Sequence, residues 1–180
     1  MKFKEAKLSD IANITMGQSP TSNFFNENGI GIEFLQGVRT FGDVYPTYDT
    51  YTTQFNRKAE KGAILFSVRA PVGKVNIANK DIAIGRGLAA IYAKNIDKNF
   101  LFYALKKVGD LADSQANGTV FSSINKKEID NLVVMIPESI TIQQQIGHIL
   151  NVLDEKIAVN KQINDNLVEL ASSLFESYFP

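Results

Sequence analysis

The segment GAILFSVRAPVGKVNIANKDIAIGRGLAAIY, residues 62–92, decides the fold class of this chain. Two of its internal stretches, 69–73 and 85–87, carry the glycine and proline that are typical of turns. Between and beside them lie four runs of aliphatic and β-branched residues, at 64–68, 74–78, 82–84 and 88–92. The segment therefore predicts four short strands at the centre of a sheet-rich domain.

Weaker patterns lie on both sides of this segment. Residues 8–14 predict a short helix with Ser9 as its N-cap, and residues 32–36 predict another strand. Apolar residues at three- and four-residue steps predict a helix over 99–112 that packs on the sheet.

The domain is expected to close with a short helix and a strand. Asn125, followed three residues later by Glu128, predicts a capped helical turn. Residues 132–136 predict a final strand, halted by Pro137. We therefore expect an α+β fold in which a mixed, β-rich domain occupies residues 1–139.

Residues 140–180 differ in kind from the rest of the chain. No glycine or proline interrupts them between His148 and Phe179, and Thr141 with Gln144 forms a capping-box pattern at their start. They predict one long C-terminal coiled-coil helix, which from Thr141 to Tyr178 would be about 55 Å long at roughly 1.5 Å per residue. Such a helix is too long for a domain of this size to cover, so much of its apolar stripe should meet another chain. The alternative is a helix folded back wholly onto its own sheet.

The apolar stripe of this helix alternates four- and three-residue steps, which is the spacing of a coiled-coil seam. The asparagines in it either set the register of helix pairing or face solvent. The residues expected to contact a partner helix are Ile146, Leu150, Leu153, Ile157, Asn160, Asn164, Leu167 and Leu174. More than one partner helix has room, because apolar residues also lie beside the seam, at Ile149, Val159, Ile163 and Leu170.

Composition restricts both the chemistry and the partners. The chain has no cysteine and one histidine, which removes disulfides, thiolate zinc sites, cysteine nucleophiles and multi-histidine metal sites. From Thr141 onward two lysines face five acidic residues, a net charge of −3, which leaves +3 for the rest of a chain whose total is +0. This balance argues against strong nonspecific attraction to phosphates. No signal segment or membrane-spanning run is found, so we expect a cytoplasmic protein with no membrane partner.

No known catalytic motif stands out. A glycine-rich cofactor turn between strand and helix is missing, as is the P-loop. The tripeptide at 5–7 lacks the upstream acid that a metal-dependent nuclease needs, and His148 is expected on the surface or in the seam of the helix. Aspartates and glutamates are numerous, but their surroundings mark out no pair for acid-base work. We therefore expect no catalytic residue, no metal and no cofactor.

Five segments in order resemble the specificity subunit of type I restriction-modification systems. They are FLQGVRTFG at 34–42, KGAILFSVRAPVG at 61–73, IGRGLAAI at 84–91, NGTVFSSI at 117–124 and IQQQI at 142–146. A full subunit of that family carries two target recognition domains, each followed by a long helix, and the two helices pair antiparallel as a spacer. The resemblance implies a target recognition domain at 1–139 and a dimerisation and spacer helix at 140–180. Only one of each is present, so the chain is either a half-size subunit or a fragment of a full one.

The resemblance also implies partners. They are double-stranded DNA, methyltransferase subunits that bind around the helices and supply S-adenosylmethionine chemistry, and, as an optional third, a translocase-nuclease subunit. A homodimer through the C-terminal helix would restore the two-domain architecture and read a palindromic, bipartite target. The near-neutral charge fits a chain that supplies base contacts while its partners supply much of the phosphate contact.

Polar residues in the predicted loops are the candidates for reading bases. Arginine pairs with guanine, and glutamine or asparagine with adenine. The candidates are Gln36, Arg39, Thr40, Tyr45, Arg69, Arg86, Asn117, Thr119 and Ser122. For Arg69 and Arg86 the alternative is an ion pair that holds a turn, and a structural role is open for Gln36 and Arg39 as well.

Two other functions compete with DNA reading. The first is a scaffold or adaptor that dimerises through its helix and binds no DNA. The second is a stand-alone enzyme, which needs a catalytic constellation that the sequence does not display.

Overall fold

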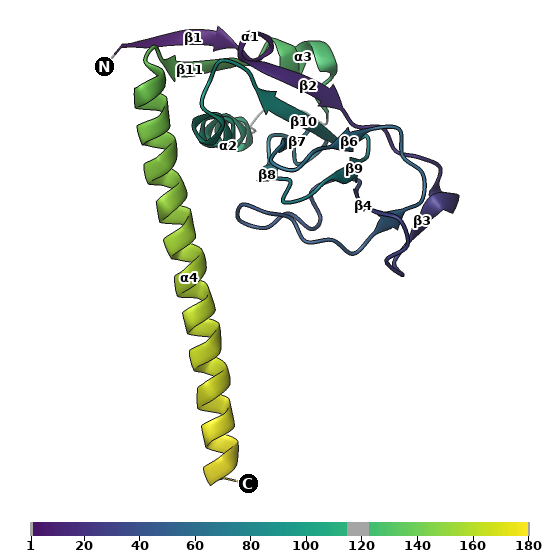
Figure 1. The fold of residues 1–180 in the computed structure, drawn as a ribbon, viewed down its shortest axis with the longest axis vertical. Helices are drawn as coiled ribbons and strands as arrows, with labels where there is room; N and C mark the ends of the chain where they lie inside the picture. Colours follow the sequence, from purple (N-terminus) through teal and green to yellow (C-terminus); the bar gives the residue numbers. More distant parts are fainter. Residues whose placement is uncertain (1, 115–122, 180) are drawn as a thin grey trace.

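The α+β prediction is confirmed, with one long helix at the end of a sheet-rich domain (Figure 1). The computed structural model describes the backbone of residues 2–114 and 123–179, with side chains placed except at 110–114. Within these ranges the helices are α1 (Leu8–Ile11), the 3-10 helix η1 (Ser22–Phe24), α2 (Lys98–Ser114), α3 (Lys126–Asp130) and α4 (Ile140–Tyr178). None of them is long and apolar enough to cross a membrane.

Three sheets make up the β structure of the described residues. The central sheet is antiparallel, in the order β2 (Ala12–Met16), β10 (Leu88–Ala93), β7 (Ile64–Ser67) and β8 (Val75–Ile77). The second sheet has the order β3 (Phe25–Asn26), β5 (Tyr51–Thr52), β4 (Ile32–Leu35), β9 (Ile82–Ile84) and β6 (Lys58–Ala59), with only β4 and β9 parallel. A third pairs β1 (Phe3–Lys7) with β11 (Val133–Pro137).

The central sheet is buried on both faces. Along β7, Ile64 and Phe66 belong to the apolar cluster that includes residues of α1 and α2, whereas Leu65 belongs to the cluster that includes residues of the second sheet. Along β10, Ile91 belongs to the first of these clusters and Leu88 to the second. Because successive side chains of a strand point to opposite faces, two apolar clusters form from one near-continuous apolar sequence.

Two local predictions are wrong. The helix predicted at 8–14 ends at Ile11 and its N-cap is Lys7, not Ser9. The residues after it are extended, because β2 pairs with β10 in the sheet. The capping box predicted at Thr141 is absent too, since α4 begins at Ile140 after Ser139, with no side-chain cap bond.

Other local predictions are confirmed. Asn125 and Glu128 form the predicted capping box, with Asn125 N–H donating to Glu128 Oε2 at 2.7 Å and Glu128 N–H donating to Asn125 Oδ1 at 3.1 Å. The predicted final strand is β11, which takes in Pro137 as its last residue, paired with Phe3.

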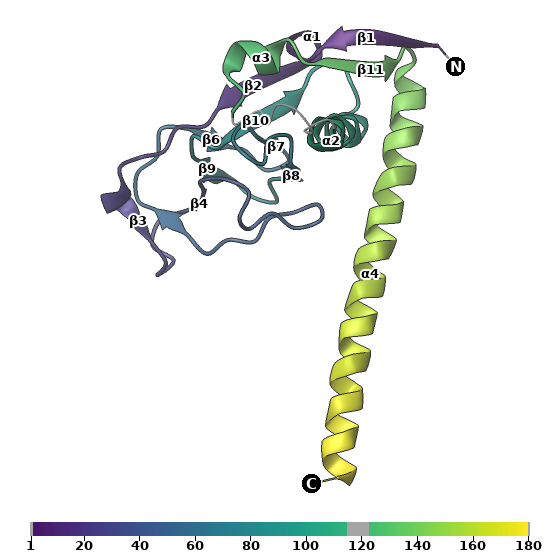
Figure 2. The ribbon, with the colours of Figure 1, turned by 180° about the vertical axis from the view of Figure 1, so that it is seen from behind.

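Contacts to the domain hold the first turns of α4. Gln143 is buried, donating from Nε2 to Pro137 O at 2.8 Å and accepting at Oε1 from Asp97 N–H at 3.0 Å. Gly147 is buried beside Phe100, where a β-carbon would lie 2.7 Å from a backbone nitrogen. From this anchor α4 extends away from the domain (Figures 1 and 2), and its residues 155–179 are exposed. The alternative of a helix folded wholly onto its own sheet is therefore wrong.

Candidate nucleic-acid interface

A ladder of backbone hydrogen bonds brings separate loops together at one end of the sheets. Gly87 N–H donates to Gln36 O at 3.1 Å, and Val68 N–H donates to Gly87 O at 2.9 Å. Ile124 N–H then donates to Val68 O at 2.8 Å. The loops after β4, after β7 and between β9 and β10 are thus fixed side by side, next to the segment that precedes α3.

Gln36 lies on this ladder, and its side chain is held by a residue that sequence reasoning missed. Ser19 donates from its hydroxyl to Gln36 Oε1 at 2.9 Å, and the same oxygen of Ser19 accepts from Arg86 N–H at 3.1 Å. Gly85 makes room for this contact, since a β-carbon there would lie 2.8 Å from Gln36 Oε1. The exposed amide of Gln36 is therefore oriented, with its Nε2 available to donate.

Arg86 and Arg69 are the exposed cations of the ladder. Both are exposed, Arg86 lies between the buried Gly85 and Gly87, and Arg69 forms an isolated β-bridge with Ser123. Among the described residues no carboxylate forms an ion pair with either guanidinium. The alternative role of a turn-holding ion pair therefore lacks support for these two arginines.

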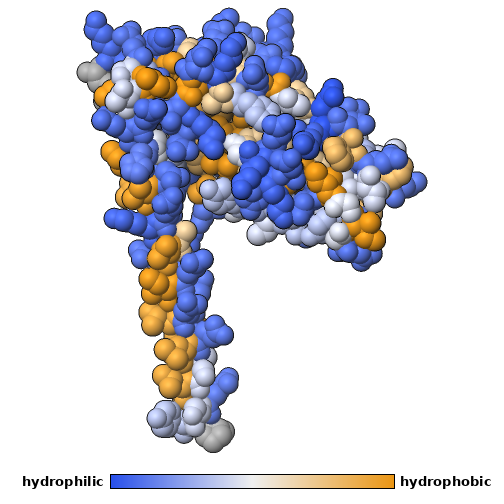
Figure 3. Space-filling view, in the orientation of Figure 1, coloured by the Kyte–Doolittle hydropathy of each residue, from blue (hydrophilic) through white to orange (hydrophobic). Residues whose placement is uncertain are grey.

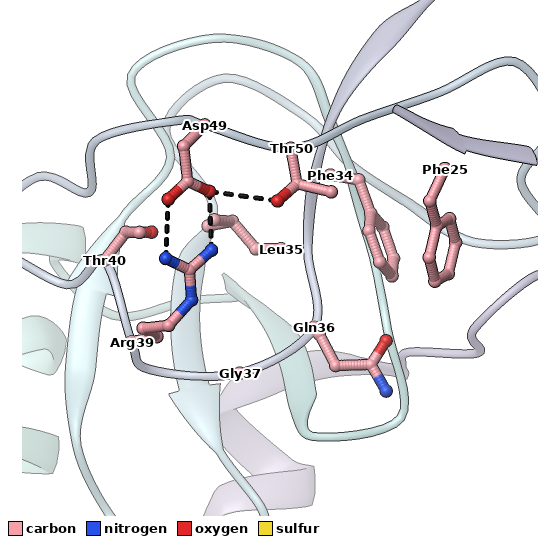
Figure 4. A pocket seen from close by; sticks show the side chains of 9 residues that line it. All are labelled: Phe25, Phe34, Leu35, Gln36, Gly37, Arg39, Thr40, Asp49 and Thr50. Carbon is pink, nitrogen blue, oxygen red and sulfur yellow. Dashed lines mark hydrogen bonds and ion pairs between the residues drawn. The ribbon is translucent and has the colours of Figure 1, made fainter. Parts of the chain in front are cut away.

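Arg39, in contrast, pairs with a carboxylate. Its Nη1 and Nη2 donate to the two oxygens of Asp49 at 2.6 and 2.7 Å, and Thr50 Oγ1 donates to Asp49 Oδ1 at 3.0 Å (Figure 4). Hydrogen bonding from Arg39 lowers the pKa of Asp49, and the same pairing raises the pKa of Arg39. The ion pair spans the loop between β4 and β5.

An apolar hollow of about 160 Å³ opens beside this ion pair. Phe25 and Phe34 stack at its edge, with ring centroids 4.6 Å apart. Thr40 also lines it, and its hydroxyl oxygen is buried with no hydrogen-bond partner in the structure. The predicted residues Gln36, Arg39 and Thr40 thus surround one hollow (Figure 4).

Of the remaining predicted readers only Tyr45 is described, and it lies elsewhere. Tyr45 is 52% exposed and lines a separate groove of about 450 Å³ between its loop and α4, together with Ile157. The structure does not bring Tyr45 together with Gln36. Asn117, Thr119 and Ser122 lie outside the described residues.

Beyond its anchor, α4 presents an apolar stripe. Ile146 and Leu150 are partly buried, whereas Leu153, Ile157, Leu167 and Leu174 are between 50% and 57% exposed. Asn160 and Asn164 are exposed as well. Figure 3 shows hydrophobic residues in a strip down the lower part of the helix, with hydrophilic residues beside it. His148, predicted at the surface or seam, is exposed on α4.

Polar contacts join the middle of α4 to the domain. Tyr103 on α2 donates from its hydroxyl to Asp154 Oδ2 at 3.0 Å. Lys161 forms an ion pair with Asp43, which lies in the loop between β4 and β5. In the described part of the chain no three His, Asp or Glu side chains gather where they could hold a metal ion.

The family model of the type I restriction modification DNA specificity domain matches residues 1–169. The chain belongs to this family. The predicted resemblance is therefore confirmed over nearly the whole sequence, including most of α4.

Curated relatives of this specificity domain agree with that assignment. The chain is 36% identical over 156 residues to a putative type I restriction enzyme MjaX specificity subunit of Methanocaldococcus jannaschii. The match covers 86% of this chain and 36% of that protein. The chain is also 31% identical over 134 residues to a putative type I specificity subunit of Mycoplasma pneumoniae, covering 69% of this chain and 34% of that protein.

Solved structures share the fold of the specificity domain. The HsdS subunit from Thermoanaerobacter tengcongensis matches with a TM-score of 0.73 and 32% identity, over 89% of this chain and 39% of that one. A chain from a study of complex assembly and conformational transition of the type I R-M system matches with a TM-score of 0.76 and 33% identity. That match covers 89% of this chain and 40% of the other chain. The present chain thus spans between 34% and 40% of the length of these four relatives.

Proposed function

We propose that this chain reads one half-site of a bipartite DNA target and directs the methyltransferase and nuclease subunits of a type I restriction-modification complex to it. The observation that carries the proposal is the backbone ladder that fixes Gln36, Arg69 and Arg86 on adjacent loops. Base reading needs donors and acceptors held at fixed positions, and loops bonded to one another through their backbones meet that need.

The chemistry of the ladder favours bases that offer acceptors. Arg86 and Arg69 carry guanidinium groups without an ion-pair partner in the described structure, and a guanidinium matches O6 and N7 of guanine. Gln36 has its Oε1 engaged by Ser19, which leaves its Nε2 to donate to guanine or thymine acceptors. We therefore expect guanine in the half-site.

The long helix supports a twofold arrangement. Its exposed apolar stripe from Leu153 to Leu174 is of the kind that pairs with a second helix, and a homodimer would use the same stripe twice. Two domains held apart by paired helices would meet two inverted half-sites separated by unread base pairs. The target is then palindromic.

The work is divided among subunits in this proposal. The chain carries no catalytic residue of its own and needs no cofactor. Methyltransferase subunits bind around the helices, contribute phosphate contacts and transfer the methyl group, and a translocase-nuclease subunit adds cleavage. A net charge of +0 fits a chain that adds little phosphate attraction by itself.

Sequencing of methylated adenines tests the proposal. We expect DNA from cells that express this chain with its methyltransferase partner to carry methylation at one bipartite, palindromic motif. Arg86→Ala is expected to relax that motif at one position per half-site. Methylation without a sequence preference that depends on this chain would reject the proposal, and a motif without twofold symmetry would reject the homodimer.

The adaptor function makes the opposite prediction. In a mobility-shift assay with the methyltransferase subunit present, an adaptor would leave sequence preference unchanged. Membership of the DNA specificity domain family favours the reader.

A further inference from the structure

Arg39 combines high exposure with a fixed orientation. Its side chain is 73% exposed, yet both terminal nitrogens bond to Asp49, whose own side chain is 46% exposed. Thr50 donates to the same carboxylate, which fixes it in turn. An exposed arginine ordinarily samples many rotamers and loses that conformational entropy when it binds. Because Asp49 and Thr50 already restrict Arg39, its binding to DNA costs less entropy.

The Arg39–Asp49 contact leaves a defined part of the guanidinium free. A guanidinium has five N–H donors, of which Asp49 accepts two. The edge between Nη1 and Nη2 faces Asp49, so the edge that includes Nε points away from that carboxylate (Figure 4). That edge offers two parallel donors, which match O6 and N7 of guanine.

The negative charge of Asp49 disfavours binding of a DNA phosphate to Arg39. A phosphate would have to share the guanidinium with a carboxylate that carries the same sign of charge. The edge of guanine carries only partial charges, so Asp49 penalises it far less than it penalises phosphate.

We propose that Asp49 is a specificity-determining positioning residue that keeps Arg39 as a guanine reader and prevents it from serving as a phosphate contact. The inference rests on the proposed function. It assigns Asp49 a role in DNA discrimination, although Asp49 is acidic and is not among the predicted base readers.

Affinity measured against salt separates this role from a structural one. Asp49→Asn is expected to raise the affinity for DNA without the target, to lower the ratio of target to non-target affinity about tenfold, and to steepen the salt slope by roughly one phosphate contact. A residue that only held the loop would lower both affinities together and leave the slope unchanged. The measurement uses the chain in complex with its methyltransferase subunit.

Asp81→Asn provides a control with the same change of charge. Asp81 pairs with Lys58 at 2.9 Å on β6, and an asparagine there retains the oxygen that accepts from Lys61 N–H. We expect this variant to leave the target ratio unchanged. An equal loss of discrimination in Asp81→Asn would assign the effect to net charge and overturn the inference.

Two Arg39 variants keep the test decisive if Asp49→Asn folds poorly. Arg39→Lys keeps the charge but loses the two-donor edge, so it should lose the guanine preference with little change of salt slope. In a double variant with Arg39→Ala, Asp49→Asn should add no further loss of discrimination. Additive losses, or methylation motifs relaxed at different positions, would overturn the inference. A wild-type complex with no sequence preference would instead reject the proposed function itself.

Discussion

The hydroxyl of Tyr103 on α2 donates a hydrogen bond to Asp154 on α4 at 3.0 Å, about four helical turns from the start of the long helix. Together with the anchor at Gln143 and Gly147, this contact packs the first part of α4 against the domain. The part beyond Lys161 has no such contact among the described residues. The helix therefore has a domain-bound half and an exposed half.

Removing that hydroxyl should weaken the folded state in a pH-dependent way. Burial and the bond to Asp154 raise the pKa of Tyr103 above its ordinary value of 10.0. A raised pKa gives stability that is complete below pH 10 and is lost as pH rises through the folded-state value. We expect Tyr103→Phe to cost about 1 kcal/mol of unfolding free energy near pH 8. In urea unfolding, the difference from wild type should shrink above pH 10; a difference that grows would contradict this account.

The contact between Gly73 and Gly109 predicts a sharp stability difference between two glycine variants. A β-carbon on Gly109 would lie 2.0 Å from Gly73 O, so Gly109→Ala must push α2 away from the hairpin of β7 and β8. We expect a loss of about 1–3 kcal/mol. Gly37 has nothing within 4 Å of its β-carbon position, and Gly37→Ala should change stability by less than about 0.5 kcal/mol. Thermal unfolding of both variants measures the contrast, and equal losses would show that the packing is not rigid.

Ser19 is expected to influence which base Gln36 prefers. Ser19→Ala removes the hydroxyl bonded to Gln36 Oε1, so the amide becomes free to turn over and accept as well as donate. We expect reduced discrimination at one base pair, with a stability loss of about 1 kcal/mol or less. Competition binding between the target and single-base variants measures it. Ser22→Ala, at an exposed serine of η1, is the control and should leave discrimination unchanged.

Asn160 and Asn164 remain predicted register-setting residues of the helix pair. Replacing both with leucine is expected to strengthen association or to change its stoichiometry, because buried amides trade stability for a single register. Sedimentation over a range of concentrations measures this. Gln162→Leu, which changes an exposed amide of the same helix outside the seam and its flanking apolar row, is the control. A double variant that stays monomeric would reject the predicted register.

Sequence patterns predicted those parts of the fold that depend on local periodicity. The four runs within 62–92 are β7, β8, β9 and β10, and the helix predicted over 99–112 is α2. Their partners could not be predicted from pattern alone. Strand β9 joins the second sheet through parallel pairing with β4. The two-residue strands β3, β5 and β6 exist only through tertiary pairing, which leaves no periodic signal.

The same limit applies to the candidate interface. Residue chemistry selected Gln36, Arg39, Arg69 and Arg86 as polar loop residues, and the backbone ladder places Gln36, Arg69 and Arg86 close together. Sequence could not show that Asp49 rather than a more distant acid would pair with Arg39, or that Ser19 would reach Gln36. Both contacts depend on how loops cross in space. Loop geometry also carried Tyr45 to the groove beside α4.

The attachment of α4 to the domain as far as Lys161 makes its exposed half a lever arm. About 26 Å of helix lies beyond Lys161 at roughly 1.5 Å per residue, so a bend of about 10° there moves the far tip by about 5 Å. Base pairs rise by about 3.4 Å along DNA, so this displacement exceeds one step of the duplex. Small bends of the exposed half of α4 would therefore shift which spacing between half-sites two joined copies accept.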